Sequence, residues 1–250
     1  LVVDSLAFWA KQGVDAFRFD LAAALLECSC DCEESYSKIN SLAGLLKEKL
    51  KEKGISVVDD FTKAQDGIIL IAEPWTCGGK QCYQLGNFPE FWAEWNDVSR
   101  DTIRKILIRP NEISPLQMRD LIEGTPSIFK EKLKSVNYIA SHDGFTLFDL
   151  NNFNHKSSST LGGSDWEISS DYGNDSYKRE NAIRKELALL FLSYGTPMIQ
   201  IGDIIMHTKN GNNNSYNKDD GTNYLNWEKA IRKDTFENRI MEYTRNLIKF

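Results

Sequence analysis

Three carboxylates in this sequence each follow a short apolar run. Asp20 follows the run at 17–19, Glu73 follows the run at 68–72, and Asp143 follows the run at 138–142. Short runs rich in Ile, Phe and Val are typical of buried parallel strands, and an acid at the carboxyl end of such a strand lies where α/β barrels carry out chemistry. We therefore expect one barrel mouth to collect all three acids.

Glycoside hydrolysis needs such a set of carboxyl groups. One carboxylate must attack or stabilise the anomeric carbon, while a second, kept protonated, gives its proton to the leaving oxygen. The sequence therefore predicts a carbohydrate-cleaving enzyme.

Each acid also has a simpler interpretation. Asp20 could cap a helix that begins near Leu21, a common role for Asp. Asp143 with Gly144 could form a turn, and Glu73 could end a strand at Pro74. All three simpler interpretations must hold together for the hydrolase hypothesis to fail.

Composition excludes several classes of protein. The 250 residues are 41% hydrophobic and 26% charged, which is typical of a soluble globular protein and excludes disorder of the whole chain. The net charge of -6 and the scattered Lys and Arg residues argue against nucleic acid or an anionic membrane as partner. No apolar stretch approaches the roughly 20 residues of a transmembrane helix, and the start does not resemble a signal peptide. We expect a cytoplasmic protein.

The five cysteines show no spacing that indicates a disulfide framework. An odd count in a chain of this size favours reduced thiols over disulfides. Cys28, Cys30 and Cys32 alternate with other residues, which is not the spacing of zinc knuckles, and only Cys77 and Cys82 remain. We interpret the cluster as a loop and expect no metal site.

The chain alternates between strand and helix patterns, with a polar, Pro-containing helical excursion before about residue 133. About five βα units of this kind predict an α/β fold with a parallel sheet and outer helices. We expect strands at 14–20, 68–73, 91–96, 136–142 and 196–202. We expect helices at 3–12, from near residue 21, and at 39–53, 98–108, 180–193 and 236–250.

Five units are three short of a (β/α)8 TIM barrel, whose core takes roughly 250 residues. A five-strand arc would expose two parallel edges, which parallel sheets rarely tolerate. We therefore expect residues 1–250 to form a partial (β/α)8 barrel domain of a larger polypeptide, with upstream strands and a C-terminal β domain outside this sequence.

The runs that end in the three acids resemble sequence motifs of the alpha-amylase superfamily, glycoside hydrolase family 13, and within it the isoamylases and bacterial glycogen debranching enzymes. GVDAFRFDLA at 13–22 resembles their fourth-strand motif, IAEPW at 71–75 the fifth, and ASHDGFTL at 140–147 the seventh. Weaker pieces fall in the same order: GNFP at 86–89, AEWND at 93–97, GTPM at 195–198 and GNNN at 211–214.

The resemblance implies a retaining hydrolase of alpha-1,6 branch linkages in glycogen or amylopectin-like alpha-glucan, which needs no metal or organic cofactor. It implies that Asp20 is the nucleophile, Glu73 the general acid and then base, and Asp143 the residue that holds the distorted sugar. His142 would donate to sugar hydroxyls. Aromatic candidates for stacking on pyranose rings are Trp75, Trp92, Trp95 and Tyr216.

Neighbouring residues agree with this division of roles. Arg18 lies two residues before Asp20 on the same strand face, and an adjacent cation would lower the pKa of that carboxyl and keep it ionised. Glu73 precedes Pro74 and Trp75, and these apolar neighbours would raise the pKa of Glu73. A retaining outcome predicts carboxyl oxygens of Asp20 and Glu73 about 5 to 5.5 Å apart.

The sequence departs from the family pattern in several places. The third-strand motif is absent because the sequence starts after it, and the segments at 28–40 and 156–163 also look divergent. Ile204 follows Asp203 where the family usually has Glu, and this departure slightly favours the alternative hypothesis, a non-catalytic glucan-binding or regulatory homologue. The retained Asp20, Glu73 and Asp143 favour catalysis, because a protein that only binds usually loses at least one of them.

Overall fold

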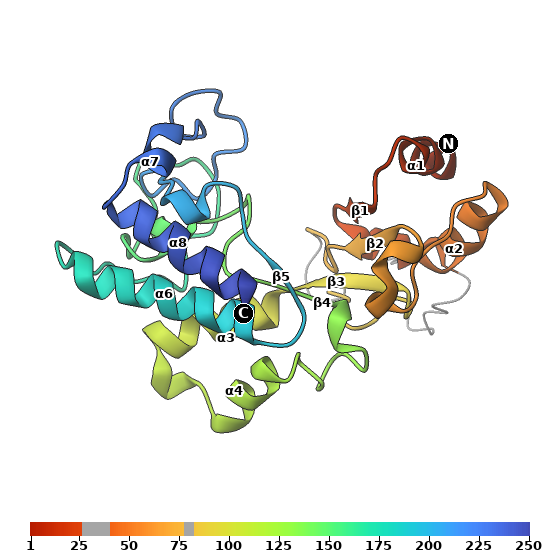
Figure 1. The fold of residues 1–250 in the computed structure, drawn as a ribbon, viewed down its shortest axis with the longest axis horizontal. Helices are drawn as coiled ribbons and strands as arrows, with labels where there is room; N and C mark the ends of the chain where they lie inside the picture. The colour runs from red at the N-terminus through yellow and green to blue at the C-terminus, as the bar shows by residue number, and fades with distance from the viewer. Residues whose placement is uncertain (27–40, 78–82) are drawn as a thin grey trace. The chain divides into compact units, whose positions relative to one another are not determined.

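The computed structural model describes residues 1–26, 41–77 and 83–250, which form two compact units (Figure 1). Unit 1 contains Leu1–Asn96 and Gly124–Val136, and unit 2 contains Asp97–Glu123 and Asn137–Phe250. Hydrogen-bonded neighbours in the sheet follow chain order, β1-β2-β3-β4-β5. This order is the one expected of successive βα units.

The described residues of unit 1 carry parallel strands and α-helices. The strands are β1 (Ala16–Phe19), β2 (Ile69–Ala72) and β3 (Trp92–Asn96), and the helices are α1 (Val2–Lys11) and α2 (Leu42–Glu52). Leu50, Leu70 and Trp92 are fully buried in the core beneath them. Phe19 lies opposite Ala72 in the register, so the residues that follow β1 and β2 emerge side by side.

Unit 2 is built mainly of helices. Helix α6 packs against both α3 and α8, and Ile103, Ile183, Leu187 and Ile240 are fully buried in the core that they share. β4 begins at the end of unit 1 and continues into unit 2. The bounds are α3 (Asp97–Ile108), α4 (Pro115–Ile122), β4 (Ser135–Tyr138), α5 (Leu147–Leu150), α6 (Ser176–Leu192), β5 (Thr196–Met198), α7 (Trp227–Ile231) and α8 (Phe236–Lys249).

Most expected elements are present, and the strands are shorter than expected. The helix expected after Asp20 is wrong in type, because a 3-10 helix at Ala22–Leu26 follows instead. Helices α5 and α7 were not expected, because four or five residues carry no readable period. Further 3-10 helices lie at Phe61–Asp66, Pro110–Glu112, Lys132–Lys134 and Asp203–Ile205.

The cysteine predictions fall largely outside the described residues. The described residues do not include Cys28, Cys30, Cys32 and Cys82. Cys77 is described, and it is exposed and free. Within the described ranges no group of three His, Cys, Asp or Glu side chains could hold a metal ion.

A buried acid lies on the inner face of α6. Glu186 is fully buried, and one of its oxygens accepts a hydrogen bond from the Asn151 side-chain amide at 2.8 Å. Its other oxygen, like the side-chain oxygen Oδ1 of Asn151, has no hydrogen-bond partner among the described residues. Burial raises the pKa of Glu186 to about 7. The folded state therefore holds a proton that the unfolded chain releases at lower pH.

We expect Glu186→Gln to remove part of the pH dependence of stability. A raised carboxyl pKa makes the free energy of unfolding fall as pH rises from the ordinary carboxyl pKa to about 7. Gln keeps the contact from Asn151 without the charge, so the variant should gain up to about 3 kcal/mol at pH 8. Near pH 4 it should match the unmodified protein. Urea unfolding at the two pH values measures both.

The matched control is Glu48→Gln, on the exposed face of α2. This variant should unfold like the unmodified protein at both pH values. An equal stability change at pH 4 and pH 8 in Glu186→Gln would contradict the assignment of the proton to Glu186.

Candidate active site

Arg18 joins two carboxyl groups at the carboxyl ends of β1 and β2. Its Nη1 lies 2.7 Å from Asp20 Oδ1, and its Nη2 lies 3.1 Å from Glu73 Oε1. Alternate residues of a strand share one face, so Arg18 and Asp20 point the same way. The parallel register brings Glu73 to the same place from the next strand. The structure therefore brings together the first two predicted acids and Arg18.

The two carboxyl groups lie in different environments. The side chain of Asp20 is 68% exposed, whereas that of Glu73 is 6% exposed. Burial raises the pKa of Glu73, and the nearby Asp20 carboxylate adds to the increase. The Leu21 amide and Arg18 act in the opposite direction. The expectation of a raised pKa for Glu73 is thus confirmed.

The backbone after β1 also contributes to the site. The Leu21 N–H donates to Glu73 Oε2 at 2.7 Å. Leu21 has a φ of +46°, a left-handed conformation that is uncommon for a residue other than Gly. This turn aims the amide at Glu73. The sequence offers no signal for it, because Leu does not favour that conformation.

A buried tryptophan supports the guanidinium. The Arg18 Cζ lies 4.2 Å from the centroid of the Trp95 ring, which belongs to β3. A guanidinium over an indole face is attracted electrostatically, by about 0.5–2 kcal/mol. Trp95 is 7% exposed, so it acts as a platform for Arg18 and is not placed to stack on a sugar.

The remaining aromatic candidates divide by exposure. Trp92 is fully buried, and its indole N–H donates to the Ala43 carbonyl at 3.1 Å, so its prediction as a sugar platform is wrong. Tyr216 is 80% exposed. Trp75 is partly buried and stacks on Tyr83, with ring centroids 6.5 Å apart and planes 10° apart. Trp75 and Tyr83 together form an aromatic pair after β2.

Unit 2 carries the other two predicted residues. His142 and Asp143 lie in the turn after β4, with side chains 53% and 69% exposed. His142 Nε2 lies 3.3 Å from Asp143 Oδ2. The Lys209 ammonium, buried itself, donates to the His142 carbonyl at 3.1 Å. Lys209 was not predicted from the sequence.

The departure at Ile204 lies within the 3-10 helix at Asp203–Ile205. Asp203 before it is buried and accepts hydrogen bonds from the amides of Leu147 and Gln200. Burial raises the pKa of Asp203 to about 6. Asp203 thus ties the backbone near β5 to α5.

In unit 1 the arrangement can support acid-assisted substitution at a carbon. An exposed carboxylate held by a cation can act as a nucleophile, and a buried carboxyl with a raised pKa can donate a proton. A buried carboxyl group with a raised pKa beside an exposed carboxylate is the pattern of glycosidase sites.

Known proteins resemble the chain over all or most of its length. An isoamylase from Flavobacterium sp is 36% identical over 270 aligned positions, which cover 100% of this chain and 33% of the relative. A glycogen debranching enzyme from Pectobacterium atrosepticum is 34% identical, covering 92% of this chain and 35% of the relative. The chain thus spans about a third of the length of these curated relatives. No model of a protein family matches it.

Solved structures agree on the fold. A pullulanase from Paenibacillus barengoltzii, in complex with maltohexaose and alpha-cyclodextrin, matches with a TM-score of 0.66 at 22% identity. The match covers 99% of this chain and 35% of that protein. It confirms the expected fold class, part of a (β/α)8 barrel. The curated relatives confirm the resemblance of this chain to the isoamylases and glycogen debranching enzymes of the alpha-amylase superfamily, glycoside hydrolase family 13.

Proposed function

We propose that this protein is a glycosidase that hydrolyses alpha-1,6 branch linkages in glycogen or amylopectin-like glucan with retention of configuration. The observation that carries the proposal is the Arg18 guanidinium between an exposed and a buried carboxyl group. The names of the relatives, isoamylase and glycogen debranching enzyme, support the choice of linkage.

The reaction takes two steps. Asp20 attacks the anomeric carbon, and the bond to the leaving oxygen breaks as that oxygen takes the proton of Glu73. The Glu73 carboxylate then takes a proton from water, which attacks the same carbon and releases Asp20. No metal or organic cofactor takes part in either step.

Arg18 organises the first step. Its two contacts hold both carboxyl groups in place and limit the repulsion that two nearby negative charges would feel. The raised pKa of Glu73, caused mainly by burial, keeps the proton available for the leaving oxygen.

The remaining predicted site residues act on the sugar. We assign Asp143 to holding sugar hydroxyls at the transition state and His142 to donating a hydrogen bond to them. The exposed side chains of both residues support these roles, because a group must be accessible to bind substrate. Trp75, paired with Tyr83, offers an apolar face for a pyranose ring.

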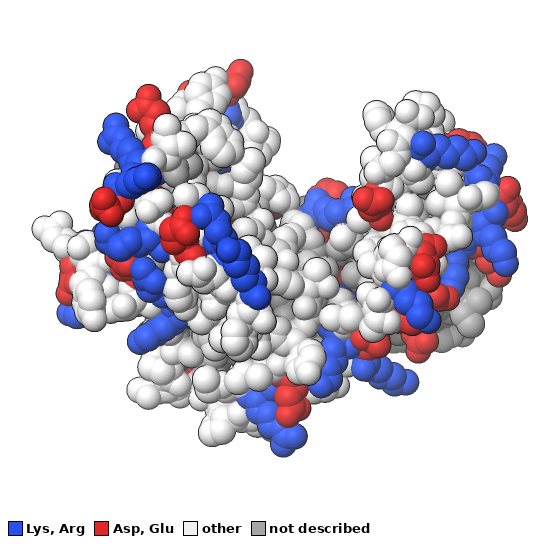
Figure 2. Space-filling view, viewed as in Figure 1, with Lys and Arg blue, Asp and Glu red and all other residues white. Residues whose placement is uncertain are grey.

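The partner we propose is a branched alpha-glucan, and neither nucleic acid nor a membrane. On the face shown in Figure 2, Lys and Arg are interspersed with Asp and Glu, and no basic stripe forms there. The net charge of -6 agrees. No helix within the described ranges is both long and apolar enough to cross a membrane.

We further propose that residues 1–250 supply the fourth to eighth βα units of the catalytic barrel, in a cytoplasmic protein. The match to about a third of each relative supports the first part. The exposed, free Cys77 supports a reducing compartment.

Substitution of either carboxyl group should abolish hydrolysis. In the intact protein, Glu73→Gln should lower the release of reducing ends from phosphorylase limit dextrin by about 100- to 10,000-fold, because it removes the proton donor. Asp20→Asn should do at least as much, because it removes the nucleophile. Asp59→Asn is the matched control, since Asp59 is also exposed, at 65%, and paired with a cation, and it should keep full activity.

If Asp20→Asn and Glu73→Gln released reducing ends as fast as the unmodified protein, both assignments would be contradicted. An unmodified protein that shifts glucan in a gel and releases no reducing ends would instead support the binding-only homologue.

The pH profile should depend on Arg18. The protonated form of Glu73 is the active acid, so activity falls as pH rises through its raised pKa. Arg18 lowers that pKa, so Arg18→Met should raise it and move the alkaline limb of kcat/KM to higher pH, while lowering the maximum. An alkaline limb that stays in place or moves to lower pH would show that Glu73 is not the titrating acid.

A further inference from the structure

Three hydrogen bonds to the backbone hold the turn that carries His142 and Asp143. Arg104 Nε donates to the Ile139 carbonyl at 2.9 Å, before the turn. Lys209 Nζ donates to the His142 carbonyl at 3.1 Å, within it. After the turn, the Gly144 N–H donates to the Asn213 carbonyl at 3.1 Å. The backbone is thus fixed on both sides of Asp143.

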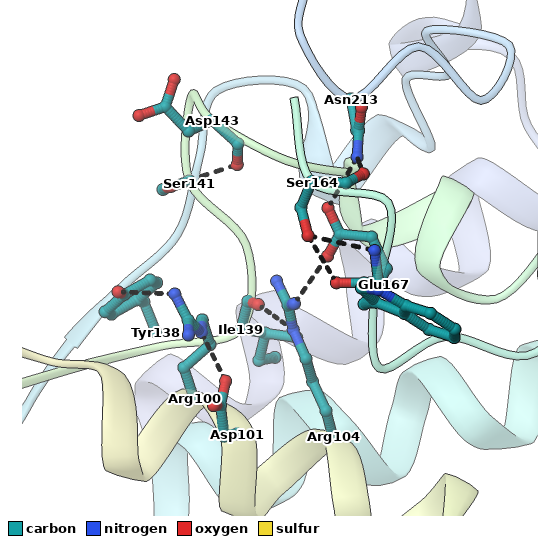
Figure 3. A network of polar contacts seen from close by, with 11 residues as sticks. Arg100, Asp101, Arg104, Tyr138, Ile139, Ser141, Asp143, Ser164, Glu167 and Asn213 are labelled. Atoms are coloured by element: carbon teal, nitrogen blue, oxygen red, sulfur yellow. Dashed lines mark hydrogen bonds and ion pairs between the residues drawn. The ribbon is translucent and has the colours of Figure 1, made fainter. Parts of the chain in front are cut away.

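Glu167 connects the first of these anchors to the last (Figure 3). Its Oε2 accepts from Arg104 Nη1 at 3.2 Å, and its Oε1 accepts from Asn213 Nδ2 at 3.2 Å. Asn213 Nδ2 also donates to the Ser164 carbonyl at 2.8 Å, which ties it to the same loop as Glu167. Arg104, Glu167 and Asn213 therefore link α3, the 164–167 loop and the 211–214 loop around one turn.

The network is buried, whereas the acid that it surrounds is not. The side chains of Arg104 and Glu167 are 6% and 10% exposed, and that of Asp143 is 69% exposed. A buried ion pair is an expensive route to stability, because apolar residues of similar volume often serve as well. Its directional contacts, in contrast, can fix a backbone position that apolar packing would leave less defined.

Close packing at Gly144 also indicates that Glu167 holds the turn. Gly144 has a φ of +78°, and a Cβ at this position would lie 3.0 Å from Glu167 Oε1. The Glu167 carboxylate therefore lies directly against the turn, so a shift of Glu167 would be felt at Gly144.

We propose that Arg104, Glu167 and Asn213 are positioning residues that set the geometry of the His142–Asp143 turn. Glu167 is the centre of the group, because it contacts both other members. None of the three acts on the sugar in this proposal; each acts through the backbone beside Asp143. The catalytic consequence rests on the proposed function, whereas the structural consequence does not.

Hydrogen exchange tests the structural consequence without any activity. In the intact protein, Glu167→Ala should speed the exchange of the peptide at 140–147 by at least about 10-fold. The Asn213 carbonyl, which accepts from the Gly144 amide, is then no longer held in place by Glu167. Glu180→Ala is the matched control. Glu180 is 14% exposed and also contacts two cations, Arg184 and Arg239, but it joins α6 to α8.

Two results would overturn the positioning role. One is unchanged exchange at 140–147 in Glu167→Ala, and the other is equal acceleration there in Glu180→Ala, which would indicate general loosening. If Glu167→Ala fails to fold, Glu167→Gln replaces it. Gln keeps an acceptor but loses the charge toward Arg104, so exchange should rise at least about 3-fold.

Kinetics test the catalytic consequence. Glu167→Ala should lower kcat by about 10- to 100-fold with a smaller change in KM, because a misplaced group costs transition-state binding most. Added to Asp143→Asn, the same change should cost little more, since both act through one group. Full additivity of the two substitutions would overturn the catalytic part of the proposal. Absence of hydrolysis by the unmodified protein would refute the proposed function, and the exchange result would still decide the positioning role.

Discussion

The candidate site in unit 1 depends on one guanidinium group between two carboxyl groups. Two acids at the ends of neighbouring strands would repel each other if both were ionised, and Arg18 contacts both of them. The contact requires the parallel register of β1 and β2, because a slip of one residue would turn Arg18 to the opposite face. Burial of Leu70 and Trp92 holds this register. The core of unit 1 thus keeps Arg18, Asp20 and Glu73 in their relative positions.

Arg18 contacts two carboxyl groups that lie in different environments. Asp20 is exposed and Glu73 is buried, although one cation contacts both. Burial raises the pKa of Glu73 against the opposing effects of Arg18 and the Leu21 amide. Environment, more than residue type, therefore distinguishes the two acids. Trp95 beneath Arg18 adds a fixed apolar support, so the guanidinium is held by three neighbours at once.

Local patterns predicted the strands and the acids that follow them, because an apolar run and its polar end are readable in one short window. They did not predict the left-handed Leu21, whose conformation is imposed by the contact of its amide with Glu73. They also misjudged Trp92, since an aromatic residue type does not reveal which face of a strand it occupies. Glu167 was missed because its partners, Arg104 and Asn213, are 63 and 46 residues away in sequence.

Asp20 in unit 1 and Asp143 in unit 2 are held in different ways, and the difference fits the roles proposed for these two acids. Asp20 is aimed by a cation that contacts its carboxylate directly. This contact suits the proposed role of Asp20 as nucleophile, because the direction of attack must be fixed. A residue that binds sugar hydroxyls must instead keep its oxygens available to substrate donors. Around Asp143, Arg104, Lys209 and Asn213 hold the backbone, and only His142 lies within ion-pair distance of the Asp143 carboxylate among the described contacts. Anchoring through the main chain fixes the position of such an acid without occupying the atoms that bind.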